Sequence, residues 1–260
     1  MSLLIIDLFQ NKLLLIFYSL SLFLSILTRI FLSIEDSFIC EIIGKICSGT
    51  AIAMMVNILI NNLIGVWRRF TCNLYGDESY LTHTLPVKKT TLYISKILAS
   101  IITLFTSVAV ITLSLYIAYY SKENLEILKS ILLPLATAYG STIIKIVLEI
   151  LFIFFLEIAN AIQAGYTGII LGHKMNNAKI GYSVLYGIGA YLLTQVFVLS
   201  LTFIAAIFNK DLMNLFITID NISVETIKLV IYLAFIIYTI TLIIGYIINI
   251  KLFTKGVNVD

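Results

Sequence analysis

The sequence predicts an all-α, polytopic integral membrane protein, on three observations. Hydrophobic residues make up 60% of the 260 residues, only 12% are charged, and the mean hydropathy is +1.06. A soluble domain carries roughly twice that charged fraction, so a water-soluble fold is excluded. The hydrophobic residues form unbroken runs that reach about 20 residues or more, the length of a transmembrane helix. A membrane barrel would instead show alternation over about 10 residues in each strand.

Six hydrophobic runs predict six transmembrane helices in a single domain that covers residues 1–260. The predicted spans are 13–34, 46–66, 92–119, 143–171, 182–208 and 227–250. No linker rich in Pro, Gly or Ser and no low-complexity tract separates them. Residues 1–12 have the composition of a short helix in the membrane interface, and an extension of the first span is the alternative.

The distribution of basic residues predicts that both termini are cytoplasmic. In that orientation the inside segments contain ten Lys and Arg residues and four acidic residues, whereas the outside loops contain five basic and eight acidic residues. Loops rich in Lys and Arg stay on the cytoplasmic side of a membrane. The net charge of +3 is too small to indicate binding of nucleic acid.

The longest cytoplasmic connection, residues 67–91, has the signals of a short helix. Gly76 ends the preceding stretch, Asp77 can cap a helix through its side-chain oxygen, and Pro86 stops that helix after about two turns. Three apolar residues would share one side of the helix: Tyr80, Leu81 and Leu85. An ordinary basic loop with suitable capping residues is the alternative.

The same connection resembles a motif of bacterial ABC-2-type transporter permeases. Residues 75–87 read YGDESYLTHTLPV, followed by Lys88 and Lys89 and then by YISKIL at 93–98. Members of that family read close to G-D/E-E-G-Y-L-T-x-T-L-P-V-S-R before a helix that begins L-x-x-S-K-L. The match is close over about 25 residues and loose over the six-span layout. The sequence departs from the family at Ser79, where Gly is usual, and at Lys88-Lys89, where Ser-Arg is usual.

The resemblance implies a permease subunit of an exporter in a bacterial cell membrane, coupled to a separate ATP-binding subunit. It implies that the short helix is a coupling helix that contacts the ATPase through Asp77, Tyr80, Leu81, Leu85 and Pro86. ATP and Mg²⁺ would be bound by the partner, because this sequence has no G-x-x-x-x-G-K-[ST] motif. Two ATPase subunits need two coupling elements, so a second permease copy or a homologue is expected. A peptide, a drug or a lipid-like molecule would be the substrate.

The fourth predicted span has the densest pattern of small residues. Four of them recur at intervals of 4, 3 and 4 and therefore share one helical face: Ala161, Gly165, Gly168 and Gly172. Small residues let another helix approach closely in a membrane. Packing within the chain and a dimer seam are both open, with Gly187 and Ala190 of the fifth span as natural partners.

The fourth span also contains most of the charges predicted to lie within the membrane. Its polar residues are Lys145, Glu149, Glu157, Asn160 and Gln163. Lys145 and Glu149 are four residues apart and can pair, whereas Glu157 would meet a different neighbour or water. Ionisable groups within membranes usually face a bundle interior or water, which predicts that this side lines the translocation path or the dimer axis. A later start of the span would instead place Lys145 and Glu149 at the outer interface.

The sequence shows no catalytic or metal-binding pattern. His83 and His173 have no ligand at metal spacing, the three cysteines are scattered, and no HExxH motif is present. We therefore expect neither an enzyme nor a cofactor in this chain. Two other functions remain open: an ATP-independent secondary transporter or substrate-binding membrane subunit, with the charged span carrying ion coupling, and a non-transporting immunity or regulatory protein.

Overall fold

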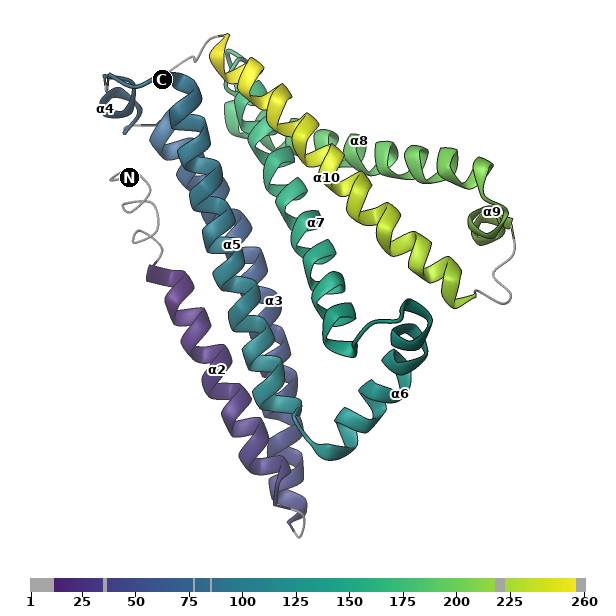
Figure 1. Cartoon of the computed structure of the whole chain (residues 1–260). Coiled ribbons are helices and arrows are strands. Elements are labelled where there is room, and N and C mark those ends of the chain that lie inside the picture. The colour runs from purple at the N-terminus through teal and green to yellow at the C-terminus, as the bar shows by residue number, and fades with distance from the viewer. Residues whose placement is uncertain (1–11, 35–36, 77, 85, 218–222, 256–260) are drawn as a thin grey trace. The chain divides into compact units, whose positions relative to one another are not determined.

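The computed structural model describes residues 12–34, 37–76, 78–84, 86–217 and 223–255, and all regular structure in these ranges is helical (Figure 1). The helices are α2 (Lys12–Leu32), α3 (Phe38–Leu74), α4 (Ser79–Thr84), α5 (Lys89–Tyr119), α6 (Lys122–Tyr139), α7 (Ile143–Gly172), α8 (Lys179–Phe208), α9 (Lys210–Ile217) and α10 (Val224–Thr254). The predicted all-α class is confirmed. The interfacial helix predicted for residues 1–12 lies outside the described residues except for Lys12.

Five of the described helices are long and apolar enough to cross a membrane: α2, α3, α5, α8 and α10. These helices support the prediction of a membrane protein. The other predicted span, residues 143–171, coincides with α7, which is helical over its whole length but is not among the five. Helix α7 carries the polar residues of the fourth predicted span and is the most extensively buried of the long helices in its unit.

The helices extend beyond the apolar runs that predicted them. Helix α3 has 37 residues and is therefore about 55 Å long, well above the roughly 30 Å of a hydrocarbon core. Its first turns contain an ion pair between Glu41 and Lys45. Its last turns include residues 67–74, for which the sequence predicts part of a cytoplasmic loop, so the connection to α5 is shorter than predicted and covers residues 75–88. Hydropathy marks the part of a helix that suits lipid, whereas backbone hydrogen bonds continue beyond it.

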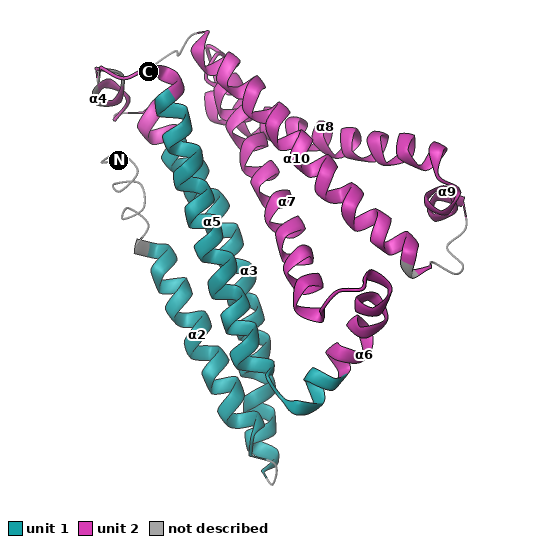
Figure 2. Cartoon of the chain, in the orientation of Figure 1, with its two compact units in different colours: residues 1–70, 91–126 teal, residues 71–90, 127–260 magenta. Residues whose placement is uncertain are grey.

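The chain divides into two compact units, which we describe separately (Figure 2). Unit 1 comprises residues 1–70 and 91–126, with α2, most of α3 and α5. Hydroxyl and amide groups join its helices: Tyr18 bonds Ser107 at 2.7 Å, Ser21 donates to Ser114, and Asn62 donates to the Thr103 carbonyl. Interhelical hydrogen bonds of this kind stabilise helix association in lipid.

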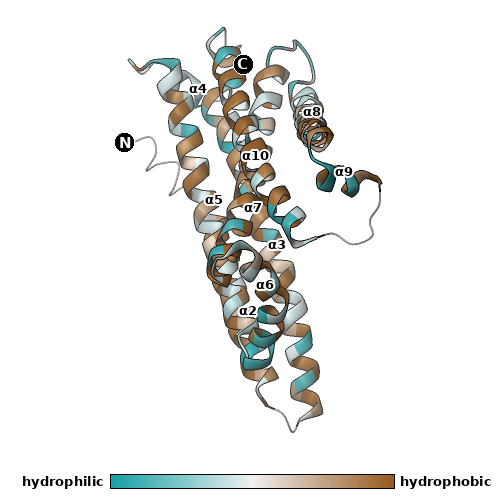
Figure 3. Cartoon of the chain, turned by 45° about the vertical axis from the view of Figure 1, so that its right-hand side comes forward, coloured by the Kyte–Doolittle hydropathy of each residue, from teal (hydrophilic) through white to brown (hydrophobic). Residues whose placement is uncertain are grey.

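Unit 2 comprises residues 71–90 and 127–260, and α7 packs against both α8 and α10 within it. The three helices are close where α7 ends and α8 begins, and α8 diverges from α7 along its length (Figure 1). Both α8 and α10 are mainly hydrophobic, and Figure 3 shows this along α10. Ala206 is the buried residue of α8, so most of this helix is free to face lipid.

Two shorter helices were not predicted from the sequence. Helix α6 occupies most of the outside segment 120–142 and contains Pro134. Helix α9 follows α8 directly, with the Asn209 side chain accepting from the backbone N–H groups of Asp211 and Leu212. Neither helix has an apolar run long enough to cross a membrane.

Candidate functional site

The short helix predicted between the second and third spans is confirmed as α4. Ser79 at its start is buried, and Tyr80 is 74% exposed. Pro86 follows α4 and is also exposed. Leu81 belongs to α4, but its side chain lies outside the described part of the chain, as do residues Asp77 and Leu85. Among the described residues of the predicted coupling set, Tyr80 and Pro86 are therefore exposed and available to a partner.

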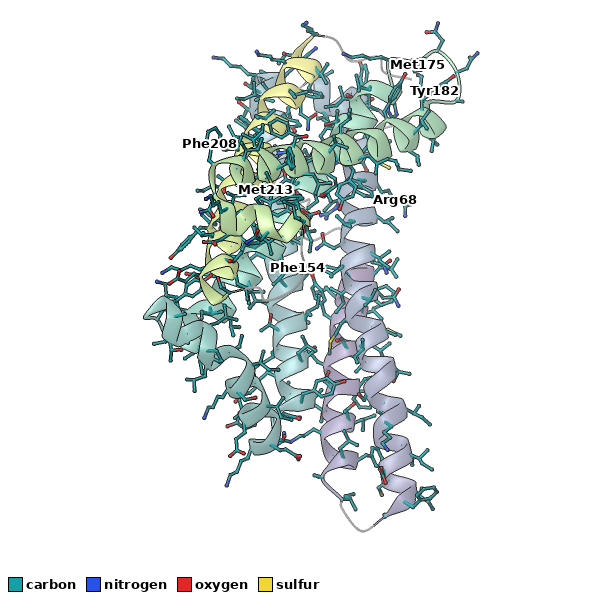
Figure 4. The ribbon with its side chains drawn as sticks, turned by 90° about the vertical axis from the view of Figure 1, so that its right-hand side faces the viewer. Arg68, Phe154, Met175, Tyr182, Phe208 and Met213 are labelled. Atoms are coloured by element: carbon teal, nitrogen blue, oxygen red, sulfur yellow. The ribbon has the colours of Figure 1, made fainter. Side chains whose placement is uncertain are left out.

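The connection that contains α4 is joined to the connection between α7 and α8. The ring of Tyr75 stacks on the ring of His173, with centroids 4.3 Å apart. Both side chains are buried, and His173 Nδ1 lies 2.9 Å from the Ile169 carbonyl oxygen. Figure 4 shows Met175 and Tyr182 at the same end of α7 and α8. Two connections that the charge distribution places on one side of the membrane therefore meet within unit 2.

Burial determines the protonation of this stacked pair. Desolvation lowers the pKa of His173 below its ordinary value of 6.5, and nearby Lys179 lowers it further, whereas the hydrogen bond to Ile169 opposes the shift. Burial raises the pKa of Tyr75. At neutral pH both rings are therefore uncharged, and His173 donates its Nδ1 proton to the Ile169 carbonyl.

The small-residue face of α7 packs against α8 of the same chain. A Cβ atom at Gly168 would lie 2.4 Å from the backbone nitrogen of Gly187, and one at Gly172 would lie 2.4 Å from that of Ser183. Gly165 also borders this contact, since its Cα would be 3.8 Å from a Cβ atom at Gly187. Ala161, the fourth residue of the face, is half-buried. Gly168 and Gly172 thus meet their neighbour within one chain.

A buried polar network joins α7 to α10. The Asn249 amide donates to the carbonyl oxygen and to the side-chain oxygen of Gln163, at 3.0 and 2.9 Å. Thr167 donates to Asn249 Oδ1 at 2.7 Å. Asn160, one helical turn before Gln163, donates to the Tyr238 carbonyl at 3.1 Å. Asn160 and Gln163 therefore serve packing between helices, where the polar side chains satisfy one another.

Glu157 forms a separate cluster between α7 and α8. Its Oε1 atom accepts hydrogen bonds from the Tyr191 hydroxyl and from Gln195 Nε2, both at 2.8 Å. Tyr238 of α10 interacts with the same carboxylate. Its Oε2 atom is inaccessible to solvent and has no hydrogen-bond partner among the described residues. Glu157 is the fifteenth of the 30 residues of α7 and lies at mid-helix.

Lys145 and Glu149 lie at the opposite end of α7 from His173. Lys145 is exposed in the first turn, where its backbone N–H donates to the capping Thr142 side chain. Glu149 is half-buried beside Tyr139 of α6, and burial together with the Glu149 carboxylate and Tyr232 raises the pKa of Tyr139. Lys145 and Glu149 form no ion pair in this structure; the described pair within 4 Å is Glu41 with Lys45.

Sequence reasoning did not identify the partners of these polar residues. Four of them lie within apolar runs of α8 and α10: Tyr191, Gln195, Tyr238 and Asn249. One sequence signal could have pointed to these residues: an amide or a tyrosine hydroxyl in a membrane helix needs a hydrogen-bond partner.

The described residues contain no group of three or more His, Cys, Asp or Glu that could hold a metal ion. Comparison with protein-family models, curated proteins and solved structures gave no match.

Proposed function

We propose that this chain is the membrane-spanning permease subunit of an ABC exporter in a bacterial cell membrane. In this proposal α7 joins the five apolar helices as the sixth span, both termini are cytoplasmic, and a separate ATP-binding subunit hydrolyses Mg-ATP. The subunit acts with a second permease, either a copy or a homologue. The proposal rests on the resemblance of residues 75–98 to ABC-2-type permeases.

The observation that carries the proposal is the construction of α4. It is a separate short helix between the long helices α3 and α5, and it presents Tyr80 with 74% of its surface exposed. An exposed aromatic residue on a short helix is suited to fill a pocket in a partner protein. The stacked rings of Tyr75 and His173 connect this segment to the ends of α7 and α8. Movement of a bound partner would thereby reach the membrane helices as a rigid-body displacement.

The test is purification of the tagged chain from its source membrane in mild detergent. We expect a protein with a Walker A motif to copurify and the preparation to hydrolyse ATP. Tyr80→Asp would place a charge in the contact, so we expect both the bound ATPase and the hydrolysis to be lost. Asn176→Asp is the matched control, because Asn176 is exposed in the connection between α7 and α8 and adds the same charge outside α4.

A wild-type chain that carries no ATPase, or a Tyr80→Asp variant that retains the ATPase in full, contradicts the proposal.

Glu157 favours a second candidate function, an ATP-independent secondary transporter. Its carboxylate lies at mid-helix in α7, and such groups often mark ion pathways. Transport by the purified chain alone, driven by an ion gradient without ATP, would support that candidate.

A further inference from the structure

The two oxygens of the Glu157 carboxylate differ in their hydrogen bonds to the described residues. Tyr191 and Gln195 both donate to Oε1, whereas the buried Oε2 atom accepts nothing from the described residues. A buried charged oxygen without a partner is costly, and the cost is larger in lipid, where water cannot supply the missing bond. Lys145, the basic residue of α7, is twelve residues away, which is about 18 Å along the helix axis. One enclosed carboxylate oxygen at mid-helix therefore has no hydrogen-bond donor among the described residues.

The surroundings of this oxygen combine aromatic and apolar groups. Tyr191 and Tyr238 approach the carboxylate from α8 and α10. An adjoining face of α8 is apolar and exposed over several turns, with residues at intervals of 4, 3 and 4: Leu192, Val196, Leu199 and Phe203. Leu192 and Val196 directly follow Tyr191 and Gln195 in the sequence, so this face adjoins the side of α8 that reaches Glu157. A carboxylate, two tyrosines and an apolar stripe therefore lie together in one unit.

We propose that Glu157 binds the ammonium group of a cationic amphiphile. The ammonium donates to Oε2, the tyrosine rings contribute cation–π attraction, and the hydrocarbon part lies along the apolar stripe of α8. A cationic amphiphile matches these residues, because its positive charge compensates the negative charge of the Glu157 carboxylate while its hydrocarbon tail lies against apolar side chains. The inference rests on the proposed transport function and names the class of substrate.

The test measures binding of radiolabelled dodecylamine, which is an ammonium ion at neutral pH, to the full chain in phosphatidylcholine nanodiscs. Dodecanol of equal chain length is the neutral probe, and empty nanodiscs give the background for both. We expect saturable binding of dodecylamine and no saturable binding of dodecanol.

Glu157→Gln keeps a side-chain oxygen that accepts from Tyr191 and Gln195 but removes the charge. We therefore expect the affinity for dodecylamine to fall at least about tenfold. Glu157→Asp restores the charge, so part of the affinity should be retained. Glu225→Gln, an exposed residue at the start of α10, is the control and should bind as the wild type does.

Three outcomes overturn the proposal: equal binding of dodecylamine and dodecanol, equal binding by the wild type and Glu157→Gln, or displacement of dodecylamine by equimolar K⁺, which would assign the site to a metal cation. The assay needs neither ATP nor a partner. Failure of ammonium binding is therefore distinguishable from failure of the proposed ATPase association, which is read from copurification.

Discussion

Gly168 of α7 and Gly187 of α8 approach so closely that a Cβ atom on Gly168 would lie 2.4 Å from the Gly187 nitrogen. The contact continues one turn further to Gly172 and Ser183. The approach is between backbones, so a flexible side chain cannot move away to make room. The absence of a side chain at Gly168 is therefore a condition for this helix pair, as small residues are at many membrane helix interfaces.

The first prediction concerns this contact. Gly168→Ala forces α7 and α8 apart, and overpacking of this kind costs about 1–3 kcal/mol. We expect a fall in Tm of at least about 3 °C for the purified chain, measured by intrinsic fluorescence. Gly189→Ala on α8 is the matched control, because a Cβ atom there meets nothing within 4 Å, and it should leave Tm unchanged or slightly raised. An equal response of the two variants would contradict the proposed role of the contact.

The second prediction concerns the bonds between α7 and α10. Asn249→Ala removes the donor to Gln163 and the acceptor of Thr167. A double-mutant cycle of Asn249→Ala with Thr167→Val should give a coupling energy of about 0.6 kcal/mol, the average for hydrogen bonds between membrane helices, and at most about 1.7 kcal/mol. Thr239→Val is the control partner, since Thr239 bonds only a carbonyl of its own helix and should be additive with Asn249→Ala. Additivity in both cycles would show that the network contributes nothing measurable.

The third prediction is a pH dependence caused by His173. Its pKa is below 6.5 in the folded chain because the ring is buried, so the unfolded state binds more protons as the pH falls. The stability that the neutral ring contributes is fully present above pH 6.5 and declines below it. We expect Tm to fall between pH 7.5 and pH 5.5, and His173→Phe, which can still stack on Tyr75 but cannot titrate, to flatten that fall. An identical pH profile for the two proteins would exclude His173 as the cause.

The fourth prediction concerns orientation in the membrane. The charge distribution places Ser121 and Lys210 outside and Thr90 inside. In a variant with Cys40, Cys47 and Cys72 replaced by Ala, single cysteines at Ser121 and Lys210 should react with an impermeant maleimide added to intact cells, and a cysteine at Thr90 should react only after permeabilisation. Labelling in the reverse pattern would refute the orientation and, with it, the assignment of α4 as a cytoplasmic contact.

How well each helix was predicted from the sequence depended on whether its signal is local. Apolar runs predicted α2, α5, α8 and α10 to within a few residues, because lipid requires such runs whatever the neighbouring helices are. The short helix α4 was predictable because Gly76 and Pro86 limit it locally. The extension of α3 to Leu74 and the helices α6 and α9 were not predicted, because their apolar residues are too few or too interrupted by polar residues to form a run of the length of a span.

The features of the candidate site were also predictable only in part. The sequence identified the small face with Gly168 and the polar residues of α7, because both depend on residue type and helical spacing alone. It did not decide whether Gly168 meets its own chain or a second copy. It also left open whether Lys145 and Glu149 pair within the span or lie at the outer interface, and this structure shows no ion pair between them. Side chains four residues apart can pair, but an exposed Lys gains little from such a pair.

By itself the sequence determined that this is an all-helical chain suited to a membrane, because hydrophobicity and helical period are local properties. Only the tertiary structure decided which polar groups meet. Tyr191 and Gln195 reach Glu157 from 34 and 38 residues away, and Asn249 reaches Gln163 from 86 residues away. Those contacts depend on how α8 and α10 lie against α7, and the approach of α8 is limited by the backbone contact at Gly168. A pairing between distant segments is settled by packing, since a hydrogen bond forms only where the fold brings donor and acceptor to within about 3 Å of each other.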